Sequence, residues 1–289
     1  MFATDQSAEF EIVTVQSGRR SLRSRRFGET FHPVIGPMAE AVALHVRQQR
    51  LVERAARTDG PFVIWDVGLG AGANAVAVLE AFAAQQSGGV ELHSFDETTA
   101  PLEFALHHAD TLEYVTPHRN AIESLLARQE WQSRAVRWDL HPGDFRKSMH
   151  SAPAPHAILY DPYSPTSNPE LWTLEHFAEL HGLLDPSRPC LLTNYTRSTA
   201  VRVTLLLAGF YVGRGHATGE KDQTTIAANA RELLEVPLEA RWLERVRRST
   251  RSTPLRVGGE RGGIGSIDAQ RLAAHPQFTV PAGSSDSPE

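Results

Sequence analysis

Cysteine is almost absent from this chain of 289 residues, in which Cys190 is the single example. A chain with one cysteine forms no internal disulfide. Cys190 lies in the apolar run Pro189–Tyr195, where a buried, unreactive thiol is more common than a nucleophile. Neither disulfide crosslinks nor thiol chemistry therefore belongs to the predicted function.

Long hydrophobic runs are also missing. No stretch approaches the roughly 20 apolar residues of a membrane-spanning helix, and the first residues, MFATDQSAEFEI, contain no apolar signal core. A hydrophobic content of 41% with 22% charged residues is typical of a folded globular protein. We expect a cytoplasmic enzyme that has no contact with a membrane.

An overall excess of positive charge is the third absence. The chain has 29 basic and 34 acidic residues and a net charge of -5, which is not typical of a protein that binds nucleic acid over its whole surface. Two local segments, Arg19–Arg26 and Arg241–Arg256, are nevertheless rich in arginine. Each is either a solvated face or mobile arm, or a contact for a polyanion such as tRNA.

Metal-ligand spacing is not found either. Thirteen histidines are scattered along the chain, and His107 and His108 are the nearest to a pair. This distribution predicts no metal site.

Short β-branched runs alternate with longer helical patterns from about residue 33 to residue 212, which predicts an α/β fold with a mostly parallel sheet. We expect the strands of this sheet in the runs FVIWDVG, VELHSFD, AVRWDL, HAILYD and CLLTNY. Helices are expected over about 37–57, 73–85, the region up to 125, 169–184 and 197–210.

Hairpins are predicted at both ends of this alternation. Two short strands flank the turn Ser17-Gly18, and the segment FYVGRGHATGEKDQTTIAAN gives two strands joined by Thr218–Lys221. A parallel sheet that ends in an antiparallel hairpin is typical of class I methyltransferases, whereas nicotinamide-binding Rossmann domains continue with parallel units. The predicted organisation is a hairpin and helix extension over 1–60, a Rossmann-like domain over 61–230, a basic arm over 231–280 and a disordered tail over 281–289.

A glycine loop follows the first predicted strand. Gly68, Gly70 and Gly72 join a strand to a helix, where glycines allow a tight turn and close approach of a ligand to backbone amides. Together with Ala73 the loop also satisfies the dinucleotide pattern G-x-G-x-x-A. Asp66, two residues before the loop, favours a cofactor with an ammonium group and would repel a pyrophosphate.

Aspartates end four predicted strands in succession. Asp96 is at a distance suited to ribose hydroxyls, which fits either cofactor, and Asp144 is at a height suited to an adenine amino group. A single aspartate at such a place is as often a turn former or a helix cap. Four together, with Asp66 and Asp161, predict a ligand site at the carboxyl edge of the sheet.

The segment Tyr160–Thr173 closely resembles the D-G-F-A-P-x-x-N-P-x-M-W-T motif of the methyltransferase module of MnmC-like enzymes. The resemblance extends from about residue 20 to residue 230 through the strings RFGETFHPVIGPMAEA, DVGLGAGAN, SFDE, PGDF and LLTNYTRSTAVRVTLLLAGFYVGRGHATGEKDQTTIA. In bacteria this module completes a 5-methylaminomethyl-uridine at the tRNA wobble position.

The resemblance implies S-adenosyl-L-methionine as the cofactor, tRNA as the substrate and Asp161 as the catalytic residue. It places cofactor contacts at Gly68, Gly70, Gly72, Asp96 and Asp144, with Asp161 beside both the cofactor and the acceptor amine. To these we add Asp66 and Phe145 as expected cofactor contacts, and Tyr163, Pro165, Asn168 and Trp172 as expected acceptor contacts. Three positions depart from the family pattern, namely Pro162, Tyr163 and Ser167. The chain is similar to a stand-alone form without the flavin-dependent oxidase domain, and its oligomeric state is not predicted.

We therefore hypothesise that Asp161 orients the acceptor ammonium group and accepts its proton, while Tyr163 and Trp172 line the pocket. Trp172 is equally consistent with a core position, and Pro165 and Asn168 with a role in shaping the loop.

Alternative interpretations remain at this stage. Asp161-Pro162-Tyr163 is also similar to the N/D-P-P-Y/F motif of enzymes that methylate exocyclic base amines, and a protein or small-molecule amine suits the acidic net charge. A nicotinamide oxidoreductase and a non-catalytic binding module are the alternatives from other classes.

Overall fold

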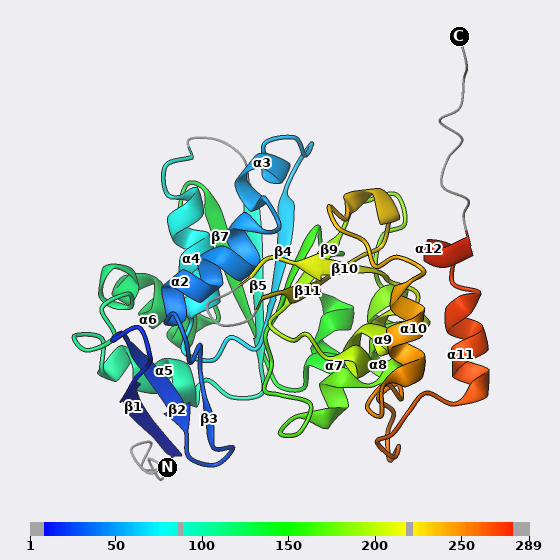
Figure 1. Ribbon diagram of the computed structural model, residues 1–289. Helices are drawn as coiled ribbons and strands as arrows, with labels where there is room; N and C mark the ends of the chain where they lie inside the picture. Colours follow the sequence, from blue (N-terminus) through cyan, green and yellow to red (C-terminus); the bar gives the residue numbers. More distant parts are fainter. Residues whose placement is uncertain (1–8, 86–88, 218–221, 280–289) are drawn as a thin grey trace.

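An eight-stranded sheet runs through the computed structural model of the protein, which describes residues 9–85, 89–217 and 222–279 (Figure 1). The strand order is β10-β11-β9-β8-β4-β5-β7-β6. Strands β9, β8, β4, β5 and β7 are parallel, while β11, β10 and the edge strand β6 are antiparallel to their neighbours. The bounds are β4 Phe62–Val67, β5 Val90–Asp96, β6 Glu130–Gln132, β7 Val136–Pro142, β8 Ala157–Tyr160, β9 Leu191–Asn194, β10 Tyr211–Gly215 and β11 Thr224–Ala228.

Two hydrophobic cores lie on the two faces of this sheet. Alternate residues of β4 point to opposite faces, so that Ile64 packs in one core and Trp65 in the other. All six residues of β4 are buried, as a central parallel strand requires.

Helices cover each face. One face carries α4 Ala73–Phe82, α5 Ala100–His107 and α6 Arg119–Arg128, which contribute to the same core. The other face carries α7 Phe145–Ser148, α8 Leu174–Gly182 and α9 Thr199–Leu207. Short 3-10 turns complete the connections at η2 Thr116–His118, η3 Met149–Ser151, η4 Pro169–Trp172 and η5 Arg231–Leu233. The predicted α/β class with a mainly parallel sheet and a closing hairpin is thereby confirmed, although the turn Thr218–Lys221 lies outside the described residues.

A second, three-stranded antiparallel sheet forms the N-terminal extension, with the order β1-β2-β3. Its strands are β1 Phe10–Thr14, β2 Arg20–Ser24 and β3 Glu29–Thr30. The predicted turn at Ser17-Gly18 is present, and Gly18 adopts a φ of 79° there. The third strand, β3, was not predicted because a pair of residues carries no readable alternation.

The expected helix over 37–57 is interrupted. It consists of α2 Pro37–Ala41, a π-helical segment η1 Val42–Arg47 and α3 Leu51–Ala55, with Arg50 in the left-handed region at a φ of 52°. Tertiary contacts account for the break, since His45 lies 2.8 Å from the hydroxyl of Thr193 and Gln49 donates to the same oxygen. Other expected helices also differ: the region up to 125 contains two helices, and 169–184 begins as the 3-10 turn η4.

Residues 231–279, expected as a basic arm, are packed on the sheet and its helices. They form α10 Trp242–Arg248, α11 Ser266–Ala273 and α12 Pro276–Thr279, and Val246 and Leu272 belong to the second core. The buried amide of Gln277 bonds both backbone groups of Val212 in β10. An arm extending into solvent is therefore not what these residues form, and the domain boundaries stay predictions. The tail over 281–289 lies outside the described residues.

Within the described ranges, none of the helices has the length and apolar character that crossing a membrane requires. The same ranges contain no group of three or more histidine, cysteine or acidic residues arranged to hold a metal ion.

Candidate functional site

The glycine loop between β4 and α4 adopts a conformation that requires glycine. Gly68, Gly70 and Gly72 have φ values of 88°, 51° and 81°. A Cβ on Gly68 would lie 2.6 Å from the backbone oxygen of Asp161, so Gly68 allows the loop after β8 to pass directly against the loop after β4. Two adjacent strand ends are thereby joined at one site.

Asp96, at the end of β5, is bound to this loop. Its carboxylate accepts from the amide of Gly70 at 2.9 Å and from the amide of Thr98 at 3.2 Å. Desolvation raises the pKa of Asp96 to about 6, although these backbone hydrogen bonds act in the opposite direction. Asp96 therefore lies beside the glycine loop, and its contact with ribose hydroxyls stays a prediction.

Asp66 lies beneath the loop rather than at the site surface. Its side chain is fully buried and accepts a hydrogen bond of 2.8 Å from Ser94, which in turn accepts from the indole of Trp138. Burial raises the pKa of Asp66 to about 7. The expected direct contact of this carboxylate with a cofactor ammonium group is therefore not supported by the geometry, because the side chain is fully buried.

Asp144 and Phe145 occupy the next strand end. Asp144 caps α7 by accepting from the amide of Arg146 and also pairs with its guanidinium at 2.7 Å, an interaction that lowers the pKa of Asp144. The Phe145 ring is buried against Trp65 and Phe95. Asp144 remains at the predicted edge, whereas the ring of Phe145 is a core side chain and not an exposed cofactor contact.

Asp161, at the end of β8, is the carboxylate nearest the centre of the site. It accepts a hydrogen bond of 2.9 Å from the amide of Asn74 in α4, and it lies 3.8 Å from the Nε2 atom of His32. Its side chain is 15% exposed, which leaves an edge for a ligand. Asn74 and His32 had not been identified from the sequence.

The loop after Asp161 is held by the N-terminal extension. Glu29 of β3 accepts from the amide and the hydroxyl of Ser164, at 3.1 and 2.6 Å, and from the hydroxyl of Ser167. Tyr163 packs between Phe27 and Phe31, with ring centroids 4.3 and 5.6 Å away. Half-buried Tyr163 therefore forms one wall of the site together with residues from 130 positions earlier in the chain.

Three further residues were predicted to contact an acceptor. Trp172 is fully buried against Tyr160 and Tyr195, and its indole donates to the backbone oxygen of Tyr163 at 2.8 Å. The expected contact of Trp172 with the substrate is therefore wrong for this geometry, because the buried indole supports the loop from below. Pro165 and Asn168 are half-buried in the loop itself, and the amide of Asn168 closes the turn on Ser164.

The residues that sequence analysis missed come mainly from 27–40 and from α4. They are Glu29, Phe31, His32, Glu40 and Asn74. The string RFGETFHPVIGPMAEA is part of the family resemblance, but its sequence alone indicates no role, because the partners of Glu29 and His32 in the loop after β8 are more than 100 residues away.

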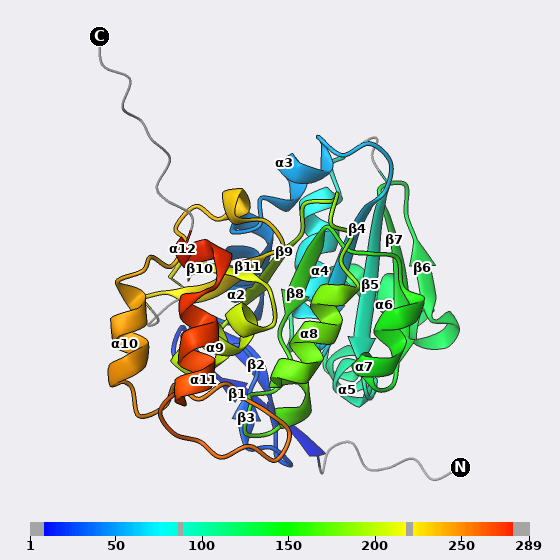
Figure 2. The same cartoon turned by 90° about the vertical axis from the view of Figure 1, so that its right-hand side faces the viewer.

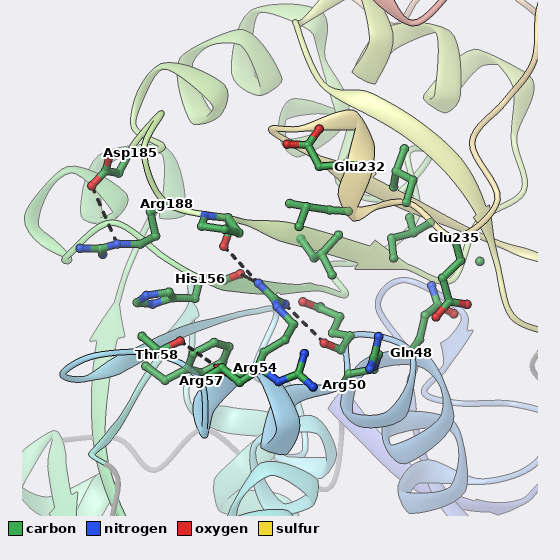
Figure 3. Close-up of a pocket in the computed structure, with 18 of the residues that line it drawn as sticks. Gln48, Arg50, Arg54, Arg57, Thr58, His156, Asp185, Arg188, Glu232 and Glu235 are labelled. Carbon is green, nitrogen blue, oxygen red and sulfur yellow. Dashed lines mark hydrogen bonds and ion pairs between the residues drawn. The ribbon is translucent and has the colours of Figure 1, made fainter. Parts of the chain in front are cut away.

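A large cleft of about 740 Å³ lies at the opposite, amino edge of the parallel strands (Figure 3). Four of the arginines that line it have partners. Arg54 donates to two backbone oxygens, Arg188 pairs with Asp185 at 3.9 Å, and Arg50 and Arg57 share Glu53 outside the cleft. This cleft is far along the strands from Asp96 and Asp161, and we do not assign it to the predicted cofactor.

Comparisons with known proteins show to which proteins this chain is similar. The sequence profile of a family described as S-adenosyl-L-methionine-dependent methyltransferase matches residues 108–230. The tRNA 5-methylaminomethyl-2-thiouridine biosynthesis bifunctional protein MnmC of Pseudomonas fluorescens is 29% identical over 272 residues, which are 87% of this chain and 40% of that protein. MnmC of Aeromonas hydrophila is 30% identical over 218 residues, 68% of this chain and 32% of that protein. The chain thus spans 40% or less of the length of these two relatives.

Solved structures show the same relationship. The crystal structure of MNMC2 from Aquifex aeolicus has a TM-score of 0.68 and 27% identity, and the match covers 91% of this chain and 84% of that one. A spermidine synthase in complex with the transition state analogue AdoDATO has a TM-score of 0.51 at 12% identity, which shows the fold alone. The hairpin β10–β11 closes the sheet as predicted for a methyltransferase.

Proposed function

Because this chain is an MnmC-like S-adenosyl-L-methionine-dependent methyltransferase, we propose that it methylates the aminomethyl group of a modified wobble uridine in tRNA. The observation that carries the proposal is the position of Asp161, a partly exposed carboxylate next to the glycine loop and the aromatic wall of Tyr163. A tRNA substrate is also consistent with the expected cytoplasmic location.

The residues present fit the cofactor. The left-handed glycines and the carboxylate of Asp96 form a cradle in which backbone amides and an acceptor for ribose hydroxyls lie side by side. A Cβ on Gly70 would lie 3.1 Å from the ring of Phe31, which shows that an aromatic side chain borders the cradle. When bound, the cofactor supplies an electrophilic methyl group on a positively charged sulfur.

The acceptor amine sets the chemical problem for the protein. An alkylamine with a pKa of about 10.4 is almost fully protonated at pH 7, and exposing its lone pair costs about 4.6 kcal/mol. In the proposed function, Asp161 holds the ammonium group by charge and hydrogen bonding, and the half-buried ring of Tyr163 excludes water on one side. Alignment of the nitrogen supplies much of the remaining rate.

Two arginine-rich segments flank this site, as tRNA binding requires. The N-terminal sheet, with exposed Arg23 and Arg25 on and beside β2, and the α10–α11 connection lie at the end of the sheet where β4 and β5 terminate (Figures 1 and 2). Arg261 of that connection is 3.4 Å from the hydroxyl of Thr166 in the acceptor loop. Phosphates on either side of an inserted nucleotide could therefore be contacted from two directions.

The test combines cofactor binding with methyl transfer. S-adenosylhomocysteine is titrated against the protein by calorimetry, and transfer of a labelled methyl group is measured on tRNA that carries 5-aminomethyl-uridine. We expect Asp161→Asn to lower turnover by about 100-fold or more while the affinity for S-adenosylhomocysteine changes by less than about threefold. The matched control is Asp110→Asn, an exposed aspartate away from the site.

If the methyl group were transferred to a free nucleoside, a protein or a small amine and not to tRNA, the proposed tRNA acceptor would be wrong. Unchanged turnover in Asp161→Asn would remove this carboxylate from catalysis.

A further inference from the structure

We propose that His32 and Glu40 form a proton relay behind Asp161, in which the imidazole of His32 receives the proton that the acceptor amine must lose. The proposal rests on the proposed amine methylation and adds two positioning residues from the N-terminal extension. Nothing in the resemblance or the comparisons assigns a role to either residue.

The geometry places one imidazole between two carboxylates. The Nε2 atom of His32 is 3.8 Å from Asp161 and the Nδ1 atom is 3.9 Å from Glu40. The side chain of His32 is 11% exposed and that of Glu40 is 8% exposed. A carboxylate buried next to the imidazole stabilises the positive charge that His32 acquires when it receives a proton.

The backbone holds His32 in this place at a cost. Its φ of 48° lies in the left-handed region, one of three described non-glycine positions with positive φ. Such a conformation persists only where the surroundings enforce it, and it is enriched at functional sites. The enforcing contacts are those of Glu29 with Ser164 and of Phe31 with the loop at Gly70, on the chain just before His32.

Glu40 is held by a second backbone irregularity. It is the fourth of the five residues of α2, two positions before the π-helical segment η1 begins. π-Helical turns are rare and often mark functional sites because they redirect side chains. One member of the pair, His32, is thus itself in the left-handed region, and the other, Glu40, lies just before the π-helical segment.

Other titratable groups face the same cluster and do not replace His32. His45 in η1 is fully buried, which lowers its pKa to about 3 and keeps it neutral. Tyr195, after β9, interacts with Asp161, Glu29 and Glu40, and burial raises its pKa well above the usual value. Asp66 lies beneath Asp161, and burial raises its pKa to about 7. Of these groups, His32 is the imidazole that pairs with Asp161, at 3.8 Å.

The proton balance follows from these positions. The substrate ammonium group gives one proton through Asp161 to His32, and Glu40 compensates the resulting charge. The freed nitrogen lone pair then forms a bond to the methyl carbon as the carbon–sulfur bond breaks, and the electron pair of that bond remains on sulfur. Because an imidazole in water is about two units more basic than a carboxyl group, it is the better final acceptor.

The main test is His32→Asn, since asparagine tolerates the left-handed backbone but cannot accept the proton. At pH 7 we expect kcat to fall by about 100-fold, with the KM for aminomethyl-uridine tRNA and the affinity for S-adenosylhomocysteine changed by less than about threefold. The deficit should shrink towards pH 10, where the amine loses its proton to water. Exogenous imidazole should restore part of the rate of His32→Gly.

Glu40→Gln should show a smaller loss, about tenfold, with the same dependence on pH. The control is His107→Asn, an exposed histidine of α5.

A loss in His32→Asn that is equal at every pH, or a loss of S-adenosylhomocysteine binding, would show a structural role and overturn the relay. A wild-type rate in His32→Asn alongside an inactive Asp161→Asn would overturn it while leaving the proposed function intact.

Discussion

At the scale of single residues, the site depends on close backbone approach and on carboxylates withdrawn from water. Gly68 permits the contact between the loops after β4 and β8, and Asp66 supports that contact from the interior. Ser167, which departs from the family pattern, donates to Glu29 and so helps to fix the acceptor loop. Each of these contacts gives a consequence that can be measured.

Gly68→Ala should destabilise the protein by about 2 kcal/mol or more and abolish binding of S-adenosylhomocysteine. The added Cβ would lie 2.6 Å from the Asp161 oxygen, at a φ of 88° that alanine rarely adopts. Chemical denaturation and calorimetry measure the two effects. Gly182→Ala is the control, because its Cβ would meet nothing within 4 Å; equal behaviour of the two variants would refute the explanation.

Asp66 should make the free protein less stable as the pH rises from about 4 to about 7. Its pKa is raised from 3.8 to about 7 in the folded chain, so between these values the folded state binds more protons than the unfolded state. The free energy of unfolding therefore decreases across this window, by about 4 kcal/mol from this group.

Denaturation of wild type and Asp66→Asn at pH 4, 5, 6, 7 and 8 measures this effect without cofactor. The variant should lack this contribution, and its stability relative to wild type should rise towards pH 7. Parallel pH curves for the two proteins would contradict the expected titration of Asp66.

At the scale of elements, segments from both ends of the chain complete the central sheet. The β3–α2 connection brings His32 to the loop after β8, and α12 brings Gln277 to β10. Neither segment shows the regular alternation that marks the central strands, so their places follow from specific long-range contacts.

Gln277→Ala should destabilise the protein by about 3 kcal/mol. The buried amide bonds the nitrogen and oxygen of Val212 and the oxygen of Leu238, and its removal leaves these groups without that partner. Urea denaturation measures the loss. Ile267→Ser in α11 is the control, since that side chain is 74% exposed; an equally small effect in both variants would indicate that α12 adds little to the fold.

At the scale of the whole molecule, an acidic protein has to present its positive charge locally to bind tRNA. The net charge is -5, yet α10 and the residues after it expose several arginines. Some are engaged in ion pairs, as Arg256 is with Asp268 at 2.8 Å and Arg248 with Glu244 at 3.3 Å. Within the described part of this segment, the exposed arginines that form no ion pair, such as Arg245, Arg247 and Arg251, are the better candidates for phosphate contacts.

A triple variant of Arg245, Arg247 and Arg251 to alanine should weaken tRNA binding and reduce the slope of log Kd against log salt by about 2. These side chains are exposed, so folding should be unaffected. Filter binding between low and high salt measures the slope. The control is Arg57→Ala in the opposite, amino edge of the sheet; an unchanged slope in the triple variant would assign this segment to structure alone.

The sequence predicted the central architecture because its signals are local. The periodicity of β4, the glycines after it and the aspartates at strand ends depend on neighbouring residues and on the shared direction of parallel strands. For this reason the sequence alone predicts a site at the carboxyl edge of the sheet that includes Asp96 and Asp161.

Only the tertiary structure decided which side chains are buried and which residues contact each other. Trp172 and the ring of Phe145 are core side chains, and Asp66 lies beneath the loop, although their sequence positions suggested exposure to ligands. The contact of Glu29 with Ser164 joins residues 135 positions apart, and no local pattern encodes such a pairing. The sequence alone therefore determined which edge of the sheet carries the chemistry, and long-range packing decided that His32 and Glu40 stand behind Asp161.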